Sequence, residues 1–139
     1  MSTMADSHKP NKKIQKAIIV SKVYHRPVGG AISEVAKLLN NLGVEAYIDQ
    51  NTAVGFNLED VPIISRRYIR DADLIIVVGG DGSLLGAARS LVDFEVPMLG
   101  INRGHLGLLT DVSPHNLEKC LKKVVEGKYT TENRMLLEV

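Results

Sequence analysis

Three glycines and one aspartate, Gly79-Gly80-Asp81-Gly82, stand between an apolar run and a stretch whose apolar residues have helical spacing. Glycine has no Cβ, so it lets the backbone come close to an anion, and the N-terminus of a following helix adds unpaired N–H donors. This turn therefore favours a phosphate group as ligand. A carboxylate in the same turn would repel phosphate unless it binds a metal ion or removes a proton from an attacking hydroxyl. The residues thus indicate phosphoryl transfer, with Asp81 as the candidate catalytic residue.

A second interpretation of Asp81 requires no chemistry. Asp-Gly is common in turns, and the Asp81 side chain would then cap the helix expected to begin near Ser83. The turn is not a Walker loop, since no Gly-Lys-Ser/Thr follows it. It also lacks the third glycine of the dinucleotide fingerprint. The turn alone leaves both interpretations open.

A second candidate segment, GINRGHLGLLTD from Gly100 to Asp111, follows the next expected strand. Its glycines and Asn102 suit a loop that passes close to a ligand, and Leu106, Leu108 and Leu109 would form the floor of an apolar pocket. The alternative is an ordinary connection between strands with a hydrophobic plug. The spacing does not decide between the two.

Alternating apolar runs and helical patterns must position these segments. We expect strands at Ala17–Val20, Val44–Ile48, Leu74–Val78 and Pro97–Ile101. We expect helices from Ile32 to a stop at Gly43, over Ser83–Leu91, and from Pro114 to a stop at Gly127. Residues 49–61 are expected to form a loop, and residues 62–70 a short amphipathic helix with Pro62 in its first turn. The alternation predicts an α/β fold, a Rossmann-like parallel sheet with helices on both faces and ligands at the carboxyl ends of its strands.

The chain divides into three parts on composition. Residues 1–14 are polar and predict a flexible tail, and residues 15–128 predict one α/β nucleotide-binding domain. Residues 129–139 follow the last expected helix and include the apolar stretch from Met135 to Val139, which ends without a turn. We expect this stretch to be the first strand of a β-rich second domain that the 139 residues do not contain.

Composition narrows the class of partner. Seventeen Lys and Arg against 16 Asp and Glu give a net charge of +1, with no basic run that would indicate nucleic acid or a membrane surface. Cys120 is a single cysteine, no secretory signal is recognisable, and no apolar run approaches the roughly 20 residues of a membrane span. We therefore expect a soluble cytoplasmic protein that binds a small molecule.

Other polar side chains give weaker signals. Lys22, His25 and Arg26 follow the first strand, where they would either hold the phosphates of a donor or lie in a solvated loop. His8 and His115 have no partner at metal-ligand spacing, so we assign no residue to a metal site.

The two glycine segments together resemble the bacterial NAD kinase family. The resemblance is carried by VVGGDGSLLGAAR and GINRGHLGLLTD, with support from IIVSKVYHRP near the start and EGKYTTENRMLLEV at the end. The Gly-Gly-Asp-Gly turn alone is also similar to phosphofructokinases and to diacylglycerol and sphingosine kinases. The Asn-x-Gly-x-Leu-Gly segment from Asn102 to Gly107 narrows the resemblance to NAD kinases.

This resemblance implies the reaction and its reactants. A phosphoryl group would pass from ATP or polyphosphate to the adenosine 2′-hydroxyl of NAD to make NADP, with Asp81 as general base. A divalent metal, Mg²⁺, would be required and carried largely by the nucleotide phosphates. Many members carry phenylalanine where Leu108 stands, so leucine would supply an apolar wall instead of a stacking ring. The implied nucleotide-binding residues are Gly79, Gly80, Asp81, Gly82, Asn102 and Leu108.

The resemblance also implies what the family's chains contain after the region that corresponds to residues 1–139. The remaining acceptor contacts and an Asn-Glu motif belong to a C-terminal β-rich domain, so we expect the isolated 139-residue chain to have no NAD kinase activity. Members form homodimers or homotetramers, which implies a homo-oligomer at full length.

Three rival functions stay open. A phosphofructokinase would carry a Gly-Pro-rich ATP loop, which the start AIIVSKVYHRPVGGAI lacks. A lipid kinase would favour an exposed apolar or basic face, and two Phe and no Trp argue against it. The third is a non-catalytic nucleotide-binding fragment.

Overall fold

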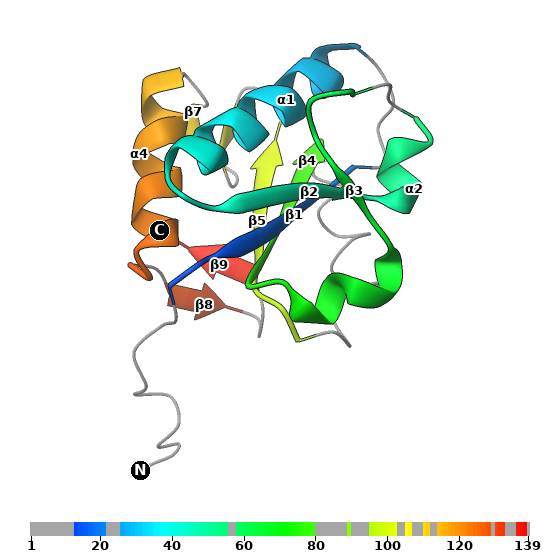
Figure 1. Ribbon diagram of the computed structural model, residues 1–139. Coiled ribbons are helices and arrows are strands. Elements are labelled where there is room, and N and C mark those ends of the chain that lie inside the picture. The colour runs from blue at the N-terminus through cyan, green and yellow to red at the C-terminus, as the bar shows by residue number, and fades with distance from the viewer. Residues whose placement is uncertain are drawn as a thin grey trace.

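Five parallel strands lie next to one another in a single sheet (Figure 1). The computed structural model describes residues 13–21, 26–55, 58–79, 89, 95–102, 105–106, 110–111, 114–128, 130–132 and 136–138. The parallel strands are β1 (Lys16–Val20), β2 (Glu45–Asp49), β3 (Ile63–Ile64), β4 (Leu74–Gly79) and β5 (Met98–Asn102). Their order across the sheet is β3-β2-β1-β4-β5. The predicted α/β fold with a parallel sheet is confirmed.

Four shorter strands extend the sheet beyond β5. They are β6 (His105–Leu106), β7 (Thr110–Asp111), β8 (Thr130–Glu132) and β9 (Leu136–Glu138). β6 pairs antiparallel with the carboxyl half of β5, and β7 pairs with β6. β9 pairs parallel with β5 at Met98 and Leu136, and β8 pairs antiparallel with β9. The assignment of residues 129–139 to a second domain stays a prediction.

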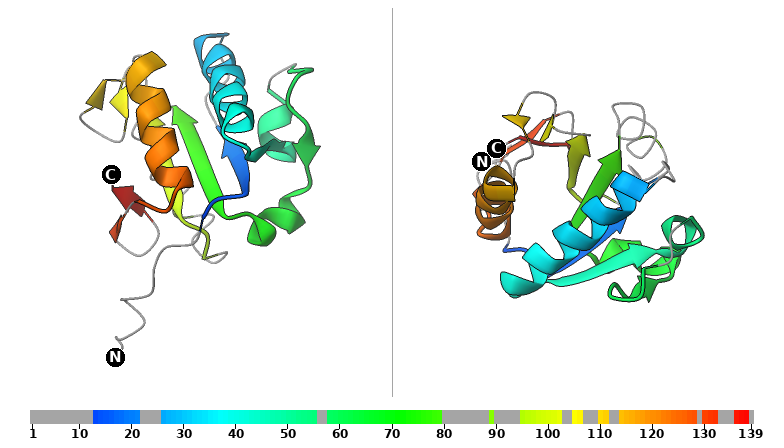
Figure 2. Two further views of the ribbon diagram at one scale, coloured as in Figure 1. Left: turned by 60° about the vertical axis from the view of Figure 1, so that its left-hand side comes forward. Right: turned by 90° about the horizontal axis from the view of Figure 1, so that it is seen from above.

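The parallel strands are apolar on both faces because both faces are covered. Successive side chains point to opposite faces, so Ile19 and Ile76 pack on one side while Ile18 and Ile75 pack on the other. The first face packs against α1 (Arg26–Asn41) and α4 (Pro114–Val125), which lie on the same side of the sheet (Figure 2). The second face packs against Ile69 of the 3₁₀ helix η2 (Arg66–Asp71).

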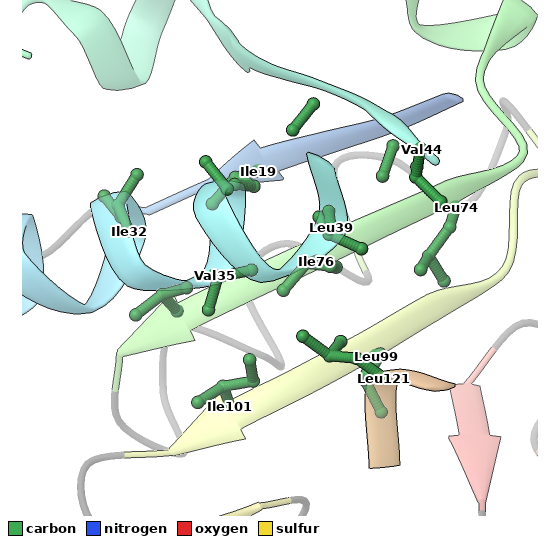
Figure 3. Packing of buried hydrophobic residues seen from close by; sticks show 14 of the residues in the cluster. Ile19, Ile32, Val35, Leu39, Val44, Leu74, Ile76, Leu99, Ile101 and Leu121 are labelled. Carbon is green, nitrogen blue, oxygen red and sulfur yellow. The ribbon is translucent and has the colours of Figure 1, made fainter. Parts of the chain in front are cut away.

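Figure 3 shows how α1 seats its apolar stripe on the first face. Ile32, Val35 and Leu39 recur at helical spacing and are fully buried over Ile19 and Ile76. On the other side of the same cluster, α4 contributes residues that pack towards β5. They are Leu117, Cys120, Leu121 and Val124. This layer fixes the strands whose carboxyl ends carry the candidate segments.

Two glycines end the long helices as predicted. Gly43 follows α1 with φ +83°, and Gly127 follows α4 with φ +82°. Both lie in the left-handed region that glycine enters without strain. The N–H of Gly43 donates to the Asn40 carbonyl and that of Gly127 to the Val124 carbonyl, each over 3.0 Å.

The prediction of one short helix over residues 62–70 is wrong in its first half. Ile63 and Ile64 form β3, which pairs in parallel with Ile48 and Asp49 of β2. The N–H of Ile48 donates to the Pro62 carbonyl over 2.9 Å, so Pro62 enters a strand instead of a helix. The backbone at the outer edge of β2 needs hydrogen-bond partners, and β-branched isoleucines favour the extended backbone that supplies them. Only Arg66–Asp71 is helical, as η2.

The expected loop over residues 49–61 contains a short helix, α2 (Gln50–Ala53). Asp49 is its N-cap, and its Oδ1 accepts from the Thr52 N–H over 3.0 Å. Arg89 is helical, while the rest of the predicted helix Ser83–Leu91 lies outside the described residues.

Ile14 packs against the α/β domain. Its side chain is buried, and its N–H donates to the Val125 carbonyl of α4 over 3.1 Å. The division of the chain at residues 14 and 128 stays a prediction.

Candidate functional site

The sheet reverses its strand order between β1 and β4. From β1 the chain builds β2 and β3 on one side, and then crosses to build β4 and β5 on the other. In open α/β sheets, ligands bind in the crevice outside the carboxyl ends of the strands at such a reversal. β1 and β4 run parallel, so their carboxyl ends lie at the same edge of the sheet (Figure 2, left). The candidate site therefore lies beyond Val20 and Gly79.

Gly79 is the last residue of β4 and begins the glycine turn. It is buried, and its φ of +151° is one that residues with a Cβ rarely adopt. A glycine is thus required where the apolar strand ends. Gly80, Asp81 and Gly82 lie outside the described residues, so their assignment stays a prediction.

Gly79 and Asn102 are neighbours across the sheet. They are Cα partners in the parallel pairing of β4 with β5, and each is the last residue of its strand. The two predicted segments, which start at Gly79 and Gly100, 21 positions apart in sequence, therefore begin side by side at the carboxyl ends of neighbouring strands. Asn102 also pairs with His105 of β6, so its segment turns back on itself at once. Leu108 lies outside the described residues.

A buried polar cluster joins the carboxyl ends of β1 and β2. The N–H of Ser21, the residue after β1, donates to the Thr52 hydroxyl over 2.9 Å. The same hydroxyl donates to the Ser21 carbonyl over 3.3 Å. Thr52 belongs to α2, and its own N–H donates to Asp49, the last residue of β2. All three residues are buried.

Arg66 supplies the positive charge of this cluster. Its Nη1 lies 3.9 Å from the Asp49 Oδ2, and its side chain is partly exposed while that of Asp49 is buried. An Asp at a strand end with polar residues after it is a helix-cap signal, which could have revealed the capping role of Asp49. The contact of Thr52 with Ser21 spans 31 positions of sequence, and no local pattern indicates it.

The structure describes few contacts of the remaining candidate residues. Lys22 and His25 lie outside the described residues, and Arg26 is described only as the first residue of α1. Cys120 is buried in the apolar face of α4, and burial raises the pKa of its thiol to about 11 against a smaller opposite effect of Lys123. Cys120 is thus a core residue.

Metal ligands are not gathered in the part of the chain that the structure describes. Among those residues no group of three or more His, Cys, Asp and Glu side chains could hold a metal ion. None of the helices in the described ranges is long and apolar enough to cross a membrane.

The strand order and its reversal define a Rossmann-like α/β protein. A family model described as the ATP-NAD kinase N-terminal domain matches residues 18–129, and the chain belongs to this family.

Relatives named NAD kinase span most of the chain. One from Marinobacter nauticus is 40% identical over 121 residues, which cover 86% of this chain and 41% of the relative. One from Hahella chejuensis is 44% identical over 111 residues, which cover 77% of this chain and 38% of the relative. The chain thus spans about two fifths of the length of these relatives.

A solved structure is similar in fold as well as in sequence. It is the crystal structure of an NAD kinase from Archaeoglobus fulgidus in complex with ATP, with a TM-score of 0.51 and 33% identity. The match covers 81% of this chain and 37% of that one.

Proposed function

We propose that this chain supplies the nucleotide-binding α/β part of an NAD kinase, which transfers a phosphoryl group from ATP to the 2′-hydroxyl of NAD. Membership of the ATP-NAD kinase N-terminal domain family and the name NAD kinase that the relatives carry support the reaction. The single observation that carries the assignment to this site is the pairing of Gly79 with Asn102. It brings together the starts of the two segments that supply all the proposed binding residues, at the reversal of the sheet.

In this proposal Asp81 is the general base. Its carboxylate takes the proton of the adenosine 2′-hydroxyl as that oxygen attacks the γ-phosphorus of ATP, and the bond from phosphorus to the β-phosphate oxygen breaks to release ADP. Backbone N–H groups of Gly80 and Gly82 bind phosphate oxygens, and Leu108 forms an apolar wall for an adenine. Asn102 orients the nucleotide from the neighbouring strand.

A divalent cation belongs to the proposal, because phosphoryl transfer from ATP develops negative charge that Mg²⁺ neutralises. In the proposal the ion is carried largely by the nucleotide phosphates. Polyphosphate as an alternative donor, assembly as a homodimer or homotetramer, and a cytoplasmic location are further parts of the proposal.

Substitution of Asp81 tests the mechanism. In the complete gene product that contains residues 1–139, Asp81→Asn should lower kcat by roughly 100-fold or more. Calorimetric titration should give Kd values for ATP and NAD within about threefold of the wild type, since the amide keeps the shape of the carboxylate. NAD, ATP and fructose 6-phosphate are titrated in parallel. Unchanged turnover would leave Asp81 as a turn residue, and saturable binding of fructose 6-phosphate would favour a sugar kinase.

The chain length gives a second test. The acceptor contacts are proposed to lie largely in the part of the family that this chain does not cover, so the 139-residue chain alone should bind ATP without forming NADP. Robust NADP formation by the purified 139-residue chain would contradict this division of the site.

A further inference from the structure

Thr52 occupies an unusual place among the buried residues. It is 1% exposed and is the buried residue of a four-residue helix whose other side chains lie nearer the surface. A buried hydroxyl is costly unless it is hydrogen-bonded, and valine would fill the same volume without that cost. The hydroxyl of Thr52 therefore has a task that packing alone does not require.

The hydrogen bonds of the Thr52 hydroxyl lie at the carboxyl end of β1. The pairing of β1 reaches Ile19 towards β2 and Val20 towards β4, so Ser21 lies just beyond the register of the sheet. Buried backbone groups at such a point need partners. The Thr52 hydroxyl bonds both the N–H and the carbonyl of Ser21, at 2.9 and 3.3 Å. One side chain thus binds both backbone polar groups of Ser21, its N–H and its carbonyl.

Thr52 is itself positioned by Asp49, whose carboxylate lies next to Arg66. Asp49 accepts from the Thr52 N–H over 3.0 Å, and Arg66 lies 3.9 Å from the other oxygen of the same carboxylate. These contacts run along the carboxyl edge from β3 and β2 to β1. They end at Ser21, next to the reversal of the sheet between β1 and β4, where open α/β sheets bind their ligands.

We propose that Thr52 is a positioning residue for nucleotide binding, which acts by fixing the backbone of Ser21 at the β1 side of the crevice. This inference rests on the proposed function, because it names the nucleotide as the ligand there. Thr52 acts through Ser21 and takes no part in the proton transfer. Its removal should weaken binding of ATP in ground state and transition state alike, which raises KM and leaves kcat nearly unchanged.

Two substitutions separate the hydroxyl from the side-chain volume. Thr52→Val keeps the shape and removes both hydrogen bonds, and Thr52→Ser keeps the hydroxyl. In the complete gene product we expect Thr52→Val to raise the KM for ATP about tenfold with kcat changed less than about twofold. Thr52→Ser should stay within about twofold of the wild type in both constants.

Asp73 provides a matched control at the opposite end of the same two strands. Its carboxylate also bonds backbone N–H groups of β1 and the residue before it, but at the amino ends, away from the crevice. Asp73→Ala should lower the free energy of unfolding and leave the KM for ATP within about twofold of the wild type. A general loosening of the sheet would instead raise KM in both variants.

Each outcome decides the matter. A KM for Thr52→Val within twofold of the wild type, or a rise equal to that in Asp73→Ala, overturns the positioning role while the proposed function stands. A wild-type protein that neither binds ATP nor forms NADP removes the proposed function itself, and this inference with it. If Thr52→Val does not fold, Thr52→Cys replaces it. The thiol is a weaker hydrogen-bonding group, so KM should fall between those of the wild type and the tenfold rise, and an unchanged KM would overturn the role.

Discussion

Asp73 and Lys16 bond each other reciprocally at the amino ends of β4 and β1. The Lys16 N–H donates to the Asp73 Oδ2 over 3.1 Å, and the Asp73 N–H donates to the Lys16 carbonyl over 2.9 Å. The same carboxylate oxygen accepts from the Gln15 N–H over 2.9 Å. Two N–H groups that precede or begin β1 are thus satisfied by one side chain just before β4.

Removal of this carboxylate should destabilise the fold. Asp73→Ala leaves two backbone donors without that acceptor, and the expected loss is about 1–2 kcal/mol in the free energy of unfolding. Urea denaturation followed by circular dichroism measures it. Asp60→Ala, at an exposed turn residue, is the control and should change stability by less than about 0.5 kcal/mol. Equal stability of both variants would show that Asp73 is dispensable.

The seat of α1 on the sheet gives a second prediction. Leu39 is fully buried against the first face, so Leu39→Ala should cost about 2–5 kcal/mol by lost burial and a remaining cavity. Its neighbour Leu38 is only partly buried, and Leu38→Ala should cost clearly less. Thermal unfolding of the two variants makes the comparison. A larger loss for Leu38→Ala would contradict the orientation of α1.

Two glycines should respond to alanine in opposite directions. Gly30 is an exposed residue inside α1 with nothing within 4 Å of an added Cβ, so Gly30→Ala should stabilise the protein by about 0.5–1 kcal/mol. Gly43 also has open space around it, but its φ of +83° strains an alanine, and Gly43→Ala should cost about 1 kcal/mol. Calorimetric unfolding distinguishes the two signs. A gain at Gly43 would rule out the left-handed stop of α1.

Cys120 should be unreactive while the protein is folded. Burial raises the pKa of its thiol to about 11, so at pH 8 roughly one molecule in a thousand carries the thiolate that disulfide reagents attack. Labelling with a chromogenic disulfide should be slow in buffer and complete in guanidinium chloride. Fast labelling in buffer would contradict the packing of α4 against the sheet.

The same raised pKa predicts a loss of stability in alkali. The thiol of the unfolded chain titrates near 9 and that of the folded chain near 11, so the unfolded state gives up its proton first. The contribution of the protonated Cys120 thiol to the free energy of unfolding is therefore complete below pH 9. It is lost as the pH rises from 9 towards 11. Cys120→Ala should lack this component when urea midpoints are compared at pH 8 and pH 11. An identical alkaline decline in the variant would assign it to other groups.

Much of the fold is predictable from local patterns. The apolar run Leu74–Val78 and the glycine stops at Gly43 and Gly127 indicated β4 and the ends of α1 and α4, because buried strands and left-handed glycines leave clear local signals. The helix prediction over residues 62–70 was wrong at Pro62, because proline suits the start of a helix and the start of an edge strand equally well. The need of β2 for a partner decided the matter, and that need is tertiary.

The candidate site was predictable in part for the same reason. Parallel order implies that the chain leaves β4 and β5 at one edge, and the pairing of Gly79 with Asn102 confirms the neighbourhood of the two strand ends. The roles of Asp81 and Leu108 stay predictions. Thr52 left no signal, because its partner Ser21 is 31 positions away and the value of a threonine there depends on where β1 stops pairing.

The lengths of the strands have a consequence for solubility. Within the described parts of the chain, the outermost strands β3, β7 and β8 have two or three residues each, while β1, β2, β4 and β5 lie inside the sheet with five or six. Unpaired rims of long strands invite another molecule to add its own strand and start a fibril. In the described part of this sheet, a second molecule would find edge strands of only two or three residues with which to pair. The described part of the chain thus places its long apolar strands in the interior of the sheet and offers little template for polymerisation at its edges.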